Sequence, residues 1–233
     1  MTNIDSNWKG LYRIGGIAAL IFIVYSLVTM IFAFTVGFEP GSVADIYNLL
    51  QTDRLQGLLR LDALTVIAIP LYYPLFLSIC VALRKTRVSF TALAALLAFA
   101  GITLILATPS AFSLIPLSDK YAAATTAAEQ AQLLAAGEAL LASDMWHGTG
   151  AMLGGILALI AELILSIVML HSSAFSRGTA IVGILTFGLD LLHFIADVFS
   201  PQAGVAIMVI AGTLYLVWFP LLARDLFKLG RDT

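Results

Sequence analysis

The chain has little charge and almost no cysteine. Only 11% of its 233 residues are Asp, Glu, Lys or Arg, whereas a soluble domain carries about 25%. The single cysteine, Cys80, excludes an internal disulfide and a metal site built from several thiolates. The net charge is −2, whereas nucleic-acid-binding domains carry an excess of basic residues that neutralises phosphates. A nucleic-acid partner is therefore not expected.

Apolar residues dominate the sequence instead. They make up 61% of the chain, and the mean hydropathy is +1.00. Apolar runs of about 20 residues, the length with which a helix crosses a bilayer, recur along the chain. They predict an all-α, polytopic membrane protein whose partner is the lipid bilayer. No polar stretch is long enough to build a second core, so we expect a single transmembrane bundle over residues 1–233.

Six membrane spans are predicted, and the segment between the third and the fourth differs from them. This segment is rich in alanine and too weakly hydrophobic to cross a membrane, and its Thr126 and Glu129 have the spacing of a capping box. It predicts one helix outside the hydrocarbon core, on the extracytoplasmic side. The predicted spans cover residues 11–36, 58–83, 89–108, 146–170, 179–199 and 203–222.

The basic residues are distributed unevenly over the predicted loops. Of the twelve Lys and Arg residues, all but Arg54, Arg60 and Lys120 fall on the side that carries both termini. The positive-inside rule therefore places both termini in the cytoplasm.

Three segments stand out by their sequence: residues 55–62 (LQGLLRLD), residues 117–138, which begin LSDKY, and residues 177–185 (RGTAIVGIL). In this order and at these separations they resemble a group of small bacterial six-span integral membrane proteins catalogued as a domain of unknown function. The resemblance implies a multi-pass protein of the bacterial inner membrane. It implies no activity and no catalytic residues.

Three ionisable residues interrupt the fifth predicted span. Asp190, His193 and Asp197 are spaced i, i+3, i+7, so they share one face of a helix. A charged residue at the centre of a membrane helix costs about 2.5–3.5 kcal/mol on insertion scales. We therefore expect other groups of the bundle to compensate for them.

The other ionisable residues of the spans are predicted to lie in the same, outer half of the bundle. At about 1.5 Å per helical residue, Arg60 and Asp62 lie near the outer end of the second span, His147 at the outer end of the fourth, and Glu162 near its middle. Tyr73 follows Asp62 by 11 positions and shares its helix face. The three spans can thus turn their polar faces into one outward-facing chamber.

Three hypotheses remain open for this chamber. In the first, it binds a small-molecule or lipid ligand, or an ion. In the second, a divalent metal ion activates water for the hydrolysis of a lipid-like substrate, held by Asp190, His193, Asp197 and His147. In the third, Arg60 pairs with a carboxylate of the second or fifth span, and the polar groups only lock the helices together. The sequence names neither a substrate nor an oligomeric state.

Overall fold

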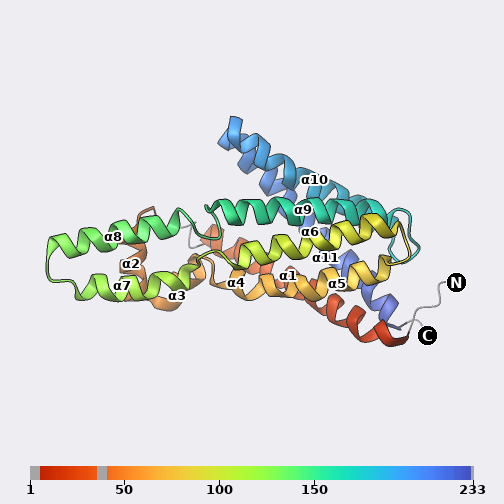
Figure 1. Cartoon of the computed structure of the whole chain (residues 1–233), viewed down its shortest axis with the longest axis horizontal. Helices are drawn as coiled ribbons and strands as arrows, with labels where there is room; N and C mark the ends of the chain where they lie inside the picture. Colours follow the sequence, from red (N-terminus) through yellow and green to blue (C-terminus); the bar gives the residue numbers. More distant parts are fainter. Residues whose placement is uncertain (1–5, 36–40, 232–233) are drawn as a thin grey trace. The chain divides into compact units, whose positions relative to one another are not determined.

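The computed structural model describes residues 6–35 and 41–231, and all regular secondary structure within these ranges is helical (Figure 1). Six stretches are long and apolar enough to cross a membrane, which confirms the predicted all-α, six-span class. They are Lys9–Phe32, Ala63–Leu83, Val88–Ala123, Thr149–Met169, Arg177–Phe199 and Pro201–Arg231.

The chain divides into two compact units. The first consists of Met1–Ser26, Leu71–Ile102 and Gly155–Thr233, and the second of Leu27–Pro70 and Thr103–Gly154. Some helices pass from one unit into the other.

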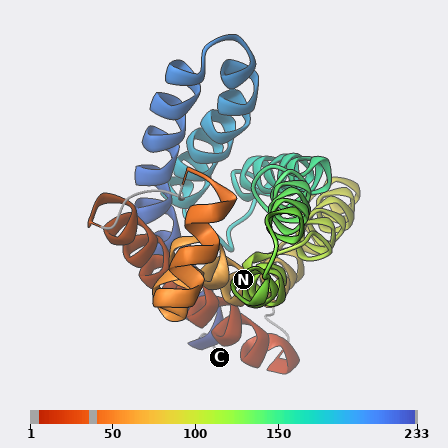
Figure 2. The same cartoon turned by 90° about the vertical axis from the view of Figure 1, so that its left-hand side faces the viewer.

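Most of the long apolar helices contribute to the first unit. They are α1 (Lys9–Thr35), α5 (Tyr72–Leu83), α6 (Val88–Leu106), α9 (Thr149–Met169), α10 (Arg177–Phe199) and α11 (Pro201–Arg231). Two of them, α10 and α11, form an antiparallel hairpin whose helices run side by side (Figure 2).

The open end of this hairpin is closed by Asp225 of α11. Its carboxylate accepts the backbone N–H of Ser176, the N-cap of α10, at 2.8 Å and the hydroxyl of Thr179 at 2.6 Å. Because a helix start has unsatisfied N–H groups and favours negative charge, this contact stabilises the first turn of α10.

The second unit contains the shorter helices. They are α2 (Val43–Thr52), α3 (Arg54–Arg60), α4 (Ala63–Ala68), α7 (Leu114–Ala123) and α8 (Ala127–Leu141). Helix α2 presents apolar residues at i, i+3, i+4 and i+7, the period of an amphipathic helix. These residues and one from α7 form the core of the unit: Val43, Ile46, Tyr47, Leu50 and Leu114.

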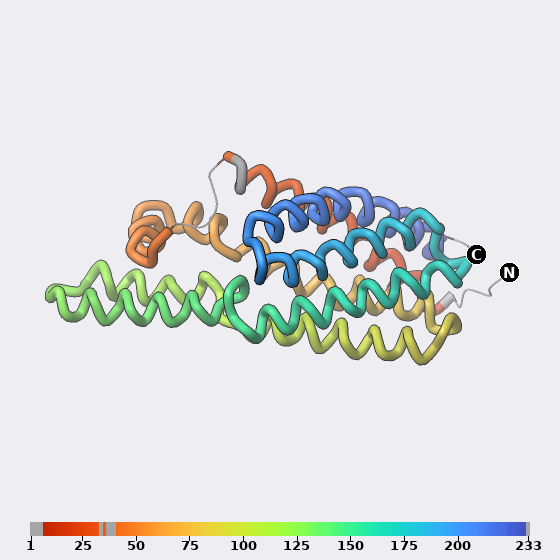
Figure 3. The backbone as a smooth tube through the Cα atoms, turned by 90° about the horizontal axis from the view of Figure 1, so that it is seen from above, coloured from red at the N-terminus to blue at the C-terminus, as the bar shows by residue number. Residues whose placement is uncertain are grey.

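The segment predicted as one helix between the third and fourth spans holds two, α7 and α8, which form a hairpin (Figure 3). The break follows from the cap of α8. The side chain of Thr126 accepts the N–H of Glu129, and the carboxylate of Glu129 accepts the N–H of Thr126. The predicted capping box is confirmed, and the extended backbone at Ala124 ends α7 just before it.

Candidate functional site

The first candidate site lies on the α10–α11 hairpin, around the carboxyl group of Asp190. The hydroxyl of Tyr215 donates a hydrogen bond of 2.7 Å to one carboxyl oxygen. Nδ1 of His193 lies 3.0 Å from the other oxygen, although it is not aligned for a hydrogen bond. The side chains of Asp190 and His193 are 17% and 19% exposed. The predicted pair of α10 residues is thus together, and Tyr215 joins it.

Glu162 of α9 adds a second carboxyl group to this region. The residue is 4% exposed, and its carboxyl interacts electrostatically with that of Asp190. The hydroxyls of Tyr72 and Tyr215 each interact electrostatically with both carboxyl groups. We call these five residues the Asp190 cluster: Tyr72, Glu162, Asp190, His193 and Tyr215.

Aromatic rings surround the tyrosines of the Asp190 cluster. Tyr72 packs on Phe22 with ring centroids 4.2 Å apart, and Tyr215 contacts Phe187 and Phe219 at 5.6 and 5.7 Å. Apolar surroundings screen charges less than water does, so electrostatic interactions within the cluster are strong. The cluster is a polar group of side chains in an apolar part of the first unit.

The predicted metal ligands fall in both units, with Asp190, His193 and Asp197 in the first and His147 in the second. Asp197 is exposed near the turn of the hairpin, where its Cα lies 2.9 Å from the position of a Cβ built on Gly204. Within residues 6–35 and 41–231, no group of three or more His, Cys, Asp or Glu side chains is placed to hold a metal ion.

The helix face predicted to join Asp62 and Tyr73 is interrupted. A 3₁₀ turn at Ile69–Leu71, which contains Pro70, separates α4 from α5 and changes the helical phase between the two residues. Tyr73 stacks on Phe99 of α6, with centroids 5.8 Å apart, and its neighbour Tyr72 belongs to the Asp190 cluster.

The second candidate site lies in the second unit, around Asp62. This residue is 2% exposed and precedes α4, but its side chain does not cap that helix. Both carboxyl oxygens instead accept the backbone N–H of Ala111, at 2.9 and 3.0 Å. Arg60, two residues earlier, ends α3. The carboxylate of Asp62 thus ties the start of α4 to a turn 49 residues later in the chain.

A second buried carboxylate, Asp144, organises the turn before α9. One of its oxygens accepts the N–H groups of Trp146 and His147 at 2.8 and 2.9 Å, and the imidazole Nδ1 of His147 lies 3.0 Å from it. Only glycine fits at Gly148, because a Cβ there would lie 2.6 Å from the carbonyl oxygen of Ser143. His147 is therefore held by this turn.

A small cavity lies between the two carboxylates. Its volume of about 10 Å³ is the space of one water-sized molecule. Asp62 and Asp144 line it and interact electrostatically. The other lining residues are Leu61, Ser110, Ala111, Leu114, Leu140, Leu141 and Trp146.

The stability of the protein should depend on pH through Asp62. Burial raises the pKa of its carboxyl, the N–H of Ala111 lowers it in part, and the charge of Asp144 raises it further. Folded Asp62 holds its proton more tightly than unfolded Asp62, whose pKa is about 3.9. Stability should therefore fall as pH rises from about 3.9 through the raised value.

Melting temperatures of the wild type and of Asp62→Asn, measured in one detergent over a pH series, test this sign. The difference between the two curves isolates Asp62, because all other titrating groups, including Asp144 and His147 beside it, are common to both proteins. Equal pH slopes for the two proteins would contradict the prediction.

Two residues of these sites were not found by sequence reasoning. Tyr215 stands in an apolar span, and its hydroxyl is the only feature of this residue that signals a buried partner. Asp144 stands just before Trp146 and the fourth span, the position of a residue that caps a helix start.

Comparisons of the chain with protein families, with curated proteins and with solved structures give no match. Its polytopic membrane character rests on the six apolar helices. The resemblance to the bacterial six-span group stays a prediction from the sequence.

Proposed function

We propose that this polytopic membrane protein binds and releases a proton at the Asp190 cluster. The observation that carries the proposal is a pair of carboxyl groups among apolar side chains: Glu162 of α9 is 4% exposed, and Asp190 of α10 accepts the hydroxyl of Tyr215 at 2.7 Å. Both stand on helices that are long and apolar enough to cross a membrane.

Like charges in apolar surroundings explain the preference for a proton. Two ionised carboxylates in one region of low dielectric repel each other, so the pair favours a state in which it shares one proton. The proton binds to a carboxylate oxygen and leaves from it to water. A small cation would offset the same charges, and the experiment below separates the two ligands.

The neighbours of Asp190 suit proton exchange. One oxygen accepts the hydroxyl of Tyr215, and the other lies 3.0 Å from the imidazole Nδ1 of His193. Under the predicted orientation α10 begins at the cytoplasmic side. Asp190, about 20 Å along the helix from Arg177, then lies near the middle of the bilayer or beyond it.

Infrared difference spectra of the purified protein in lipid nanodiscs test the proposal. The wild type should show the band of a protonated carboxyl group, and this band should disappear as pH rises. Glu162→Gln and Asp190→Asn should each remove this band, because either change leaves a single carboxyl. Tyr215→Phe should shift it, because a hydrogen bond to Asp190 is lost.

Glu138→Gln is the matched control, since Glu138 is an exposed glutamate of α8. It should leave the band unchanged. If the spectrum responds to sodium, potassium or a quaternary ammonium ion at constant pH, and does not respond to pH, the ligand of the cluster is a cation and not a proton. If the spectrum responds to neither, the polar groups of the cluster only hold the helices together, and the proposal is refuted.

A further inference from the structure

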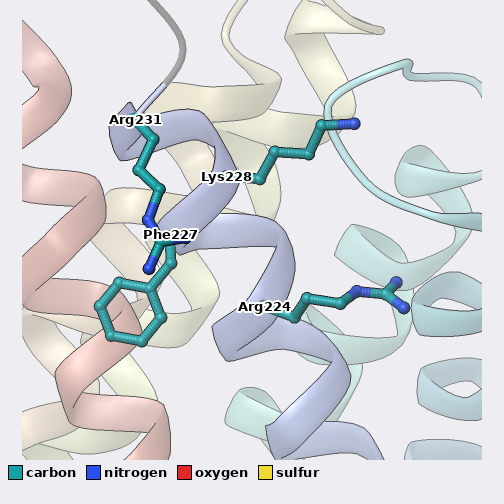
Figure 4. A pocket seen from close by; sticks show the side chains of 4 residues that line it. All are labelled: Arg224, Phe227, Lys228 and Arg231. Carbon is teal, nitrogen blue, oxygen red and sulfur yellow. The ribbon is translucent and has the colours of Figure 1, made fainter.

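The last two turns of α11 carry a basic pocket. Its volume is about 290 Å³, close to the lower limit of about 300 Å³ for pockets that hold small ligands. Four side chains of one helix line it, at the spacing i, i+3, i+4 and i+7, and Figure 4 shows two of them extending to one side of the helix and two to the other. They are Arg224, Phe227, Lys228 and Arg231.

Two of the three basic side chains in this pocket can pair with an anionic ligand. Arg224 donates hydrogen bonds to Asp225 and to Ser176, so it is held in place and partly neutralised. Lys228 and Arg231 are exposed, and neither has an acidic partner within salt-bridge distance in the part of the chain that the structure describes.

The wall beside the cations contains an aromatic ring. The ring of Phe227 covers Gly16 of α1, where a Cβ would lie 3.0 Å from the ring. One turn later Gly230 packs against the stem of Arg13, which adds a further basic residue from α1 to this end of the unit. A ligand here meets positive charge and an aromatic surface together.

The depth of the pocket indicates which anion it meets. Helix α11 has 31 residues, hence a length of about 46 Å, which exceeds the roughly 30 Å of the hydrocarbon core. All of its basic residues lie in its last turns, which therefore reach the level of lipid headgroups. The sequence predicts that this end faces the cytoplasm, where anionic lipids attract basic residues.

We propose that this pocket binds the phosphate headgroup of an anionic phospholipid. Lys228 and Arg231 pair with the headgroup charges, Arg224 adds a donor fixed by Asp225, and Phe227 contacts the glycerol and the first methylenes of the acyl chains. This site is separate from the Asp190 cluster and does not depend on proton binding there.

Thermal unfolding and native mass spectrometry of the purified protein with added phosphatidylglycerol or phosphatidylcholine test the pocket. Phosphatidylglycerol should raise the melting temperature and stay bound in the spectrometer, and phosphatidylcholine should do neither. The double variant Lys228→Gln, Arg231→Gln should bind phosphatidylglycerol about 25-fold more weakly, since each basic residue near a membrane surface contributes roughly fivefold.

Arg177→Gln is the matched control, because Arg177 is an exposed basic residue at the same end of the hairpin and outside the pocket. It should keep nearly full binding. A roughly fivefold loss in Arg177→Gln, as large as that expected for each of Lys228 and Arg231, would mean general attraction to charged lipid and would overturn the pocket. If glycerol phosphate stabilised the protein as much as phosphatidylglycerol does, the ligand would be a soluble phosphate, and the assignment of the pocket to a lipid would be wrong.

Discussion

Gly183→Ala is expected to lower the free energy of unfolding by about 1–3 kcal/mol, the usual effect of an extra methyl group in a packed core. A Cβ at this position of α10 would lie 2.7 Å from Nε1 of Trp218 and 3.1 Å from Cβ of Ser166, and still nearer to the Ser166 hydroxyl. Trp218 cannot move aside, because Phe187 and Phe219 pack against it at 4.8 and 5.2 Å. The larger Gly183→Leu should prevent the first unit from packing.

Gly188→Ala, five residues later on the same helix, is the matched control. A Cβ there meets no atom within 4 Å, so the change should be neutral or should stabilise by up to about 1 kcal/mol through helix propensity. Melting curves and size-exclusion profiles of both variants in one detergent provide the comparison.

Adding Ser166→Gly to Gly183→Ala should restore part of the lost stability, because it removes the two Ser166 atoms that the new methyl group meets and leaves only the contact with Nε1 of Trp218. The packing account fails if Gly183→Ala and Gly188→Ala melt alike, or if Ser166→Gly brings no recovery.

Asp62→Ala is expected to destabilise the second unit by about 1–3 kcal/mol. The substitution leaves the N–H of Ala111 buried without its acceptor, which costs the desolvation of that group. Asp62→Asn keeps an oxygen that can accept this N–H and removes the repulsion from Asp144. It should therefore be close to the wild type in stability near neutral pH.

Hydrogen exchange measured by mass spectrometry localises the effect. Peptides around residue 111 and across α4 should exchange faster in Asp62→Ala and at the wild-type rate in Asp62→Asn. Asp119→Asn on α7 is a further control, because Asp119 pairs with Arg54 and both side chains are about half exposed. If Asp62→Asn is as destabilised as Asp62→Ala, the carboxylate charge matters more than the acceptor.

The sequence by itself determined the class of this protein and several local features. Apolar runs of about 20 residues can satisfy their backbone in lipid only as helices, so the spans follow from hydropathy. The capping box at Thr126 and Glu129 is equally local, because both hydrogen bonds join residues within one turn. The contact of Asp190 with His193 follows from their spacing on one helix.

Only the tertiary structure decided the partners of the polar groups. Asp62 accepts a backbone N–H from Ala111, and Asp190 accepts the hydroxyl of Tyr215, partners 49 and 25 residues away. Helical periodicity states which residues share a face of one helix. It does not state which faces meet, and the 3₁₀ turn at Ile69–Leu71 shifts the phase of one of them. The partners of buried polar groups depend on which helix faces meet, and the local sequence does not determine this.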